Sequence, residues 1–213
     1  MKILFIGEPN SSNTVSWIEG LRRQGCEVYL ASARTDGDDG SIPIGSPKLS
    51  ARMRILTGAT SLRKIIQDIK PDILLAYRIT SYGYLAARTG FHPLVLAAQN
   101  EQIVYLPKPS RIRRFALERF VRCAVKKADL IHSWGDNITN GLLKYGADRN
   151  KILTLHRGID MDAFHIGRSK QFNPESPVFV STRSLYPEYL IDKVIDAFAL
   201  LAEKIPGARL EIA

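Results

Sequence analysis

The fold is decided by residues 128–164, which read ADLIHSWGDNITNGLLKYGADRNKILTLHRGIDMDAF. The short apolar run at 128–133 predicts a buried parallel strand, since strands covered on both faces read as continuous apolar segments. Asp136 is a candidate N-cap for the helix that follows, because its carboxylate can accept from unpaired N–H groups in the first turn.

This predicted helix ends in a way typical of glycine. Ile138, Leu142 and Leu143 recur at helical spacing, and Gly146 stands where a C′ glycine would end the helix. A second short strand follows at 151–155, and a glycine turn closes it. Strand, helix, strand and turn make one α/β unit.

The first 165 residues repeat this alternation. Apolar strands are predicted at 2–7, 27–31, 72–77 and 93–98, with helices between them and a loop at 35–50. We therefore expect an α/β domain over residues 1–165 with a parallel sheet and the first strand at its centre. Ser12 and Asn13 lie in the polar loop after the first strand, where such sheets bind ligands. A plain turn remains an equal alternative there.

The order of residues in 128–164 resembles the end of the N-terminal domain of family 4 glycosyltransferases with the GT-B fold. The matching positions are Ala128, Asp129, Gly146, Lys151, Ile152, Gly158, Asp160 and Phe164. The chain departs from the pattern at Gly135, where the family often has Ser, and at Arg157, where Asn is commoner. The resemblance implies a Rossmann-like sheet that holds the acceptor side of a sugar-transfer site.

The same resemblance nominates binding residues in the first domain. Ser12 and Asn13 would face the donor phosphates or the acceptor, and Gly135 and Asp136 are further binding candidates. Gln99 stands where relatives have a histidine that lines the reaction site, and Gln102 where they have an aspartate. Gln99 can donate a hydrogen bond but cannot carry a proton, so no catalytic residue is assigned.

A second domain is predicted to begin after a polar linker at 166–176. Residues 177–213 read as the start of a βαβ unit that resembles the family's C-terminal, donor-binding domain. Matches fall at Arg183, Leu185, Pro187, Glu188, Asp192, Ala197 and Phe198. The resemblance places Arg183 at the donor diphosphate, with the alternative of an ordinary strand-end arginine, and puts Tyr189 in place of a phosphate-binding lysine.

Residues 107–128 predict a basic amphipathic helix. Arg111, Arg119, Arg122 and Lys126 share one side, and the other side carries Ile112, Ala116, Phe120, Cys123 and Ala124. One interpretation is contact with an anionic membrane surface, as in membrane-associated relatives of the family. The other is a solvated basic face over a buried apolar stripe.

Composition narrows the class of protein. The 213 residues are 45% hydrophobic and 24% charged, with a net charge of +9 that favours acidic partners. No zinc-ligand pairs or aromatic-basic strand motif point to nucleic acid, and no cluster has metal-ligand spacing. Two cysteines and the absence of a signal-peptide pattern favour a cytoplasmic protein. Such a protein can also bind peripherally to the inner face of the membrane.

Taken with the resemblance, these features imply transfer of a sugar, with retention, from a nucleotide-diphosphate donor to a hydroxyl of a glycan or lipid-linked acceptor, as in polysaccharide biosynthesis. No cofactor or metal is expected. Two alternatives stay open: a nucleotide-sugar epimerase of the same fold, and a non-catalytic nucleotide-sugar-binding module. The sequence ends inside the second strand of the new domain, before the family's paired glutamates, so we expect an incomplete chain.

This leads to a first prediction. The 213-residue chain by itself should release no nucleotide from any nucleotide sugar, because a half-built cleft stays wet and its charges stay screened. Donor binding should not saturate at millimolar concentration. Turnover by the purified chain, followed by release of free nucleotide, would contradict the assignment of donor binding to residues beyond Ala213.

Overall fold

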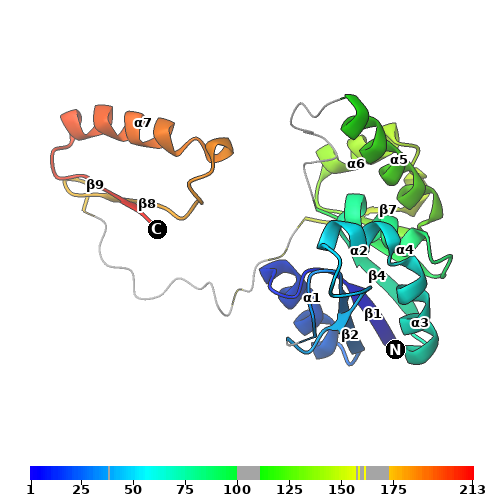
Figure 1. Ribbon diagram of the computed structural model, residues 1–213. Helices are drawn as coiled ribbons and strands as arrows, with labels where there is room; N and C mark the ends of the chain where they lie inside the picture. The colour runs from blue at the N-terminus through cyan, green and yellow to red at the C-terminus, as the bar shows by residue number, and fades with distance from the viewer. Residues whose placement is uncertain (38, 100–110, 157, 159–160, 162–172) are drawn as a thin grey trace. The chain divides into compact units, whose positions relative to one another are not determined.

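The chain folds into two units, Met1–Gly158 and Ile159–Ala213 (Figure 1). The structure is a computed structural model that describes residues 1–37, 39–99, 111–156, 158, 161 and 173–213. Each unit is described by itself. The predicted linker at 166–176 and the predicted turn at 156–160 lie largely outside the described residues, and both stay predictions.

The first unit is built on a parallel sheet of seven strands in the order β3-β2-β1-β4-β5-β6-β7. The strands are β1 (Lys2–Ile6), β2 (Glu27–Ser32), β3 (Ile42–Pro43), β4 (Ile73–Tyr77), β5 (Leu94–Ala98), β6 (Leu130–Ser133) and β7 (Ile152–Thr154). Every pairing is parallel, and β1 pairs with both β2 and β4. The predicted Rossmann-like parallel sheet is confirmed, and β1 is an interior strand as expected, although β4 and not β1 is the middle strand.

Helices cover both faces of this sheet. They are α1 (Ser12–Arg23), α2 (Ala51–Thr57), α3 (Ala59–Ile69), α4 (Tyr84–Ala87), α5 (Arg111–Lys127) and α6 (Asp136–Lys144). A π-helical turn, η1 (Arg78–Gly83), runs directly into α4, and a 3₁₀ turn, η3 (Arg149–Lys151), precedes β7. The strand β3 was not expected, because the sequence from 35 to 50 has the composition of a loop, and α2, which begins directly after that segment, was not predicted either.

Two apolar clusters fix these layers. On one face, Ile18 of α1 packs with Phe5 and Tyr77 of the sheet. On the other face, residues of α3, α5 and α6 share a larger cluster that includes Leu62 and Leu142. Strands covered on both sides need apolar residues at every position, which is why β1 reads as a continuous apolar run.

The boundaries of α6 correct one prediction and confirm another. The helix begins at Asp136, so Gly135 occupies the N-cap position predicted for Asp136. Asp136 instead places its charge in the first turn, where the helix dipole favours it. Gly146 follows the C-cap with φ of +86°, the left-handed conformation that glycine adopts without strain.

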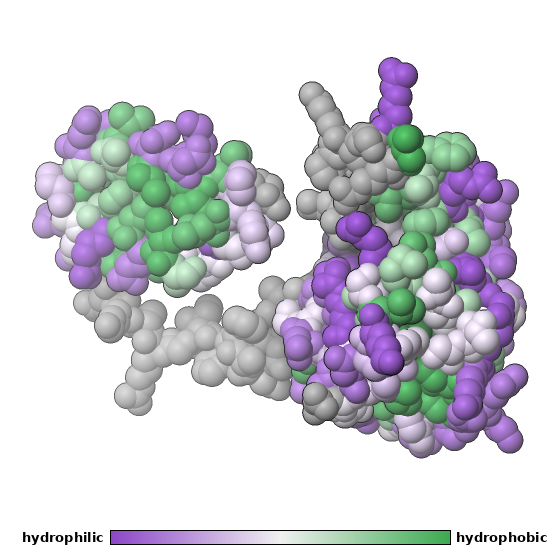
Figure 2. Space-filling view, viewed as in Figure 1, coloured by the Kyte–Doolittle hydropathy of each residue, from purple (hydrophilic) through white to green (hydrophobic). Residues whose placement is uncertain are grey.

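The second unit contains a parallel pair of strands, β8 (Val178–Ser181) and β9 (Arg209–Ile212), joined through α7 (Ile191–Lys204). A 3₁₀ turn, η4 (Pro187–Tyr189), lies between β8 and α7. Large apolar side chains stay exposed, among them Phe179 at 43% and Leu200 at 65%. Figure 2 shows this apolar surface on the second unit. One helix can cover only one face of a two-stranded sheet, so apolar residues on the other face stay exposed.

A buried arginine holds the 34–50 segment against α2. Arg54 is 5% exposed, and its guanidinium donates to the carbonyls of Thr35 (2.7 Å) and Leu49 (3.0 Å) and to the Asp36 carboxylate (2.7 Å). This network satisfies the backbone of a segment rich in turn residues, which explains how Ile44 becomes fully buried beside it.

Removal of this arginine should therefore destabilise the first unit. Arg54→Met leaves buried carbonyl groups unpaired, and we expect a loss of about 2–4 kcal/mol in the free energy of unfolding. Arg52→Met is the matched control, since Arg52 is exposed on the same helix and should change stability by less than about 0.5 kcal/mol. Urea unfolding measures both, and equal losses would show that the network is not structural.

Candidate acceptor site

Three strands of the first unit end in charged residues at one edge of the sheet. Glu8 follows β1, Arg34 follows β2, and Arg78 follows β4. The chain leaves β1 for β2 on one side and later returns to β4 on the other, so the topological switch point lies between β1 and β4. Open α/β sheets bind ligands outside the carboxyl ends of the strands at such a point.

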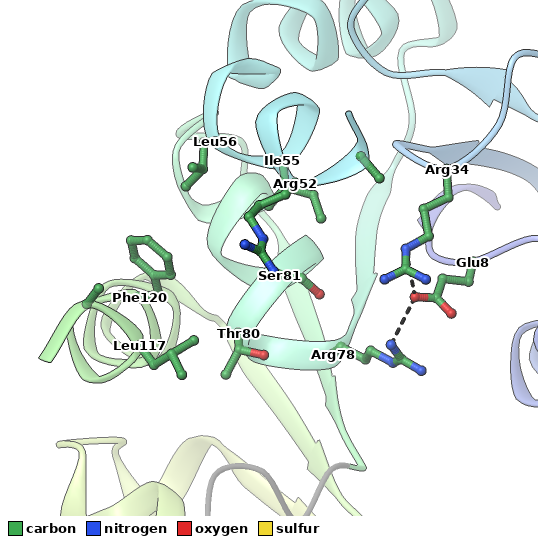
Figure 3. A pocket seen from close by; sticks show the side chains of 12 residues that line it. Glu8, Arg34, Arg52, Ile55, Leu56, Arg78, Thr80, Ser81, Leu117 and Phe120 are labelled. Carbon is green, nitrogen blue, oxygen red and sulfur yellow. Dashed lines mark hydrogen bonds and ion pairs between the residues drawn. The ribbon is translucent and has the colours of Figure 1, made fainter. Parts of the chain in front are cut away.

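Glu8 joins the ends of these three strands. Its Oε1 accepts from Arg78 Nη1 at 2.9 Å and lies 3.3 Å from Arg34 Nε, while its side chain is 18% exposed. Figure 3 shows the two guanidinium groups converging on the carboxylate from opposite sides. We call these three residues the Glu8 clasp.

Arg78 adopts a backbone conformation that disfavours any side chain. Its φ is +72°, in the left-handed region that costs a residue with a Cβ roughly 1 kcal/mol or more. The residues around it are held firmly: Tyr77 and Ile79 are buried, and the hydroxyl of Tyr82 lies 3.1 Å from Ser32 Oγ. Burial raises the pKa of Tyr82, so its hydroxyl stays neutral. Strain held in this way concentrates at functional sites.

A pocket of about 490 Å³ opens beside the clasp. Its polar wall comes from the strand ends, η1 and α2, and consists of Glu8, Arg34, Arg52, Arg78, Thr80 and Ser81. Its apolar wall comes from α2 and α5, and consists of Ala51, Ile55, Leu56, Ala116, Leu117 and Phe120. Figure 3 shows both walls facing one space. We call it the carboxyl-edge pocket.

The structure brings two of the predicted site residues into contact. Asn13 Nδ2 in α1 donates to Gln99 Oε1 at the end of β5, at 3.2 Å. Asn13 Oδ1 is buried without a partner among the described residues, so it is available to accept a hydrogen bond. Ser12 is exposed at the start of α1, on the same edge, so Ser12 and Asn13 lie in the first turn of a helix and not in the predicted loop.

Gly135 and Asp136 lie farther along this edge, at the end of β6, and contact neither Asn13 nor Gln99 by hydrogen bond. Ser133 Oγ donates to the Gly135 carbonyl at 3.0 Å, and Asp136 is exposed. The role of these residues in binding stays a prediction.

Comparison with known proteins places this unit in a family. Residues 2–134 match the family described as glycosyl transferase 4-like. The chain belongs to the glycosyl transferase 4-like family. No curated protein matches the sequence. The match covers the whole of the carboxyl edge up to β6.

Solved structures share the fold at low identity. Sucrose-phosphate synthase from Thermosynechococcus elongatus has a TM-score of 0.73 at 12% identity, with 100% of this chain and 62% of that chain covered. Anabaena HepE in complex with UDP-glucose has a TM-score of 0.67 at 16% identity, and the match covers 100% of this chain and 60% of that chain. UDP-GlcNAc 2-epimerase from Neisseria meningitidis bound to UDP-GlcNAc has a TM-score of 0.57 at 17% identity, and the match covers 100% of this chain and 65% of that chain. These likenesses confirm the predicted GT-B type of fold, and the chain spans about three fifths of the length of these proteins.

Arg183 of this glycosyl transferase 4-like chain lies in the second unit, after β8. Its guanidinium sits over the ring of Tyr189, 5.3 Å from the ring centroid. The stacking orients the guanidinium without neutralising it, as cation–π contacts do. The two residues that the sequence compared with the family's phosphate ligands are thus neighbours in space.

Helix α5 carries the predicted basic face, with one correction. Arg111, Arg119, Arg122 and Lys126 are all exposed, while Ala124 is buried as predicted. Ile112 was expected in the buried stripe, but it is 83% exposed. The apolar contacts of α5 begin about one turn later, at Ala116, because α5 packs against η1 and α4 from there on.

The described residues contain no group of three His, Cys, Asp or Glu side chains that could hold a metal ion. No helix within those residues is long and apolar enough to cross a bilayer. The expectation that the reaction needs no metal stays a prediction.

Sequence reasoning missed the clasp and the carboxyl-edge pocket. Glu8, Arg34 and Arg78 each follow a correctly predicted strand, so the rule that ligands bind at the carboxyl ends of parallel strands could have found them. The family pattern directed attention to the position of Gln99 instead.

The strain at Arg78 gives a testable consequence. Lys70 is the matched control, since it is exposed, also has a positive φ of +53°, and contributes no side chain to the pocket. Lys70→Gly should raise the free energy of unfolding by about 1 kcal/mol. Arg78→Gly relieves similar strain but removes a contact with Glu8, so its gain should be smaller, and thermal unfolding measures the difference. An equal gain in both variants would show that the clasp contributes nothing to stability.

Proposed function

We propose that this protein is a glycosyltransferase that moves a sugar from a nucleotide-diphosphate donor to an acceptor hydroxyl, with retention. The observation that carries the proposal is the carboxyl-edge pocket at the topological switch point of a glycosyl transferase 4-like unit. In this proposal the first unit holds the acceptor, and the second unit contributes Arg183 to the donor diphosphate.

The main contribution of the protein to this reaction would be electrostatic stabilisation of the leaving group. Negative charge builds on the leaving diphosphate, and preoriented donors stabilise it. Arg183, held over Tyr189, is one such donor. The Asn13–Gln99 pair offers neutral amide groups to phosphate or sugar oxygens, and neither side chain can take a proton from the acceptor. Hydroxyl activation is therefore not assigned to either residue.

Structural neighbours support a nucleotide sugar as the donor. Anabaena HepE is in complex with UDP-glucose, and the N. meningitidis epimerase is bound to UDP-GlcNAc. The second of these also supports an alternative function, nucleotide-sugar epimerisation. An epimerase needs no acceptor, however, so dependence on an acceptor distinguishes the two functions.

Nucleotide release separates these functions. A chain of this family that carries this first unit and a complete donor-binding domain should release UDP from UDP-glucose or UDP-GlcNAc only when an acceptor is added, and mass spectrometry should find the sugar on that acceptor. Conversion of the nucleotide sugar to an isomer without acceptor would establish the epimerase. Saturable nucleotide binding with neither product would establish a non-catalytic binding module.

We also propose that the protein is cytoplasmic and that the basic side of α5 contacts the anionic inner face of the membrane. Phe115 projects on the same side as the four predicted basic residues at 3.6 residues per turn, and it is 62% exposed beside Ile112. Arg119 lies over the Phe115 ring, 5.7 Å from its centroid. Exposed apolar residues among arginines are typical of helices that lie in a lipid interface.

Vesicle cosedimentation tests this contact. The protein should bind vesicles with anionic lipid and dissociate as salt rises, since the Debye length falls from about 10 Å to about 3 Å between 0.1 and 1 M. Arg119→Glu with Arg122→Glu, or Phe115→Ala alone, should weaken binding. Arg23→Glu with Lys64→Glu is the control for the same charge change on exposed sites of α1 and α3. Equal binding to neutral vesicles, or equal loss in the control, would indicate a solvated basic face.

A further inference from the structure

We infer that the acceptor is an anionic amphiphile: a molecule with a phosphate-class group that binds at the Glu8 clasp and an apolar chain that lies against α2 and α5. This inference rests on the proposed function and names the substrate class of the same pocket. It follows from the way in which charge and apolar surface are divided between the two walls.

The polar wall has an excess of positive charge. Three guanidinium groups, those of Arg34, Arg52 and Arg78, face the pocket against the single carboxylate of Glu8. Arg52 makes no ion pair within the described part of the chain, and Figure 3 shows it reaching toward Ser81. Guanidinium groups in a fork arrangement match the oxygens of a phosphate better than those of an uncharged sugar.

Glu8 sets the geometry of this wall. Its carboxylate fixes the directions of Arg34 and Arg78 at 3.3 and 2.9 Å, so each guanidinium still has N–H groups that do not face Glu8. Thr80 and Ser81 add hydroxyl groups that can donate to a further oxygen. A bound anion can therefore be satisfied without displacing Glu8.

The apolar wall would gain no favourable contact from a purely polar ligand. Ile55 and Leu56 of α2 face Leu117 and Phe120 of α5 across the pocket. Phe120 is fixed by stacking on Tyr84, with ring centroids 4.1 Å apart, so it offers a rigid apolar face. Burial of a chain here is favourable by the usual gain for each methylene removed from water.

Apolar side chains continue along α5 beyond the pocket, which favours a ligand whose apolar chain is longer than the pocket itself. Ala116 lines the pocket, and Ile112 and Phe115 are exposed within one turn of it on the same helix. From Phe120 to Ile112 the helix rises by roughly 12 Å. A chain that leaves the pocket can continue along apolar side chains of α5 toward the side that we propose meets the membrane. A lipid phosphate fits this path better than a free phosphate compound does.

Binding of alkyl phosphates to the 213-residue chain tests the inference directly. Calorimetric titrations would compare octyl phosphate, hexyl phosphate, inorganic phosphate and octyl glucoside, all below micelle concentrations. We expect octyl phosphate to bind about tenfold more tightly than hexyl phosphate, because two more methylenes are buried. Inorganic phosphate and octyl glucoside should each bind at least about tenfold more weakly than octyl phosphate.

Variants separate the two walls. Arg78→Gly and Arg52→Gln should each weaken octyl phosphate about tenfold, and Arg52, being exposed, can be changed without a risk to folding. Leu117→Ser should weaken octyl phosphate but leave inorganic phosphate unchanged. Arg23→Gln, an exposed arginine of α1, should change neither.

Several outcomes would overturn the inference. Equal affinity for octyl phosphate and inorganic phosphate would show a site for free anions, and equal affinity for octyl glucoside would show an apolar groove without charge recognition. Unchanged binding in both arginine variants would place the anion elsewhere. The titrations use no nucleotide sugar, so their failure leaves glycosyl transfer to another acceptor intact. Tight octyl phosphate binding by this chain, without sugar transfer when the first unit is joined to a complete donor-binding domain, would overturn the proposed function alone.

Discussion

The ion pairs of Glu8 with Arg34 and Arg78 are the constraint on which the functional edge of this protein depends. Each residue follows a different strand, and the parallel sheet alone brings the three strand ends together. The carboxylate spans the switch point and gives two long, flexible side chains one geometry. Arg78 accepts an unfavourable backbone angle in this arrangement, and its neighbours in η1 and β4 are buried firmly enough to hold it there.

The clasp also divides the edge of the sheet by chemistry. On the side of β2, β1 and β4, positive charge meets the apolar walls of α2 and α5. On the side of β5, the Asn13–Gln99 pair is neutral and polar. One helix, α5, contributes part of the apolar wall of the pocket and also the exposed Phe115 among its arginines. An acceptor that arrives from a lipid surface would therefore meet one continuous structure, from the proposed membrane face to the anion-binding group.

The sequence was sufficient for β1, β4 and β5 in particular, because strands that are buried on both faces read as continuous apolar runs. It was insufficient for β3 and α2, since Ile44 is buried through contacts of Arg54 that no local pattern records. The family resemblance nominated Asn13 and Gln99 separately as binding candidates, but only the structure shows that these two residues, 86 positions apart, are in contact. The clasp was missed because Glu8 and Arg78, 70 residues apart, become neighbours only when the strand order is known. Ile112 was misplaced because periodicity gives the side of a helix but not where its packing begins.

Photolabelling with an octyl phosphate that carries a diazirine at the end of its chain tests the amphiphile-binding pocket most directly. We expect adducts within residues 51–56 and 116–120, and their loss when unlabelled octyl phosphate is added in excess. The same adducts should disappear in Arg78→Gly while the protein stays folded. Labelling confined to residues 173–213, or labelling of α5 that excess octyl phosphate does not suppress, would contradict it.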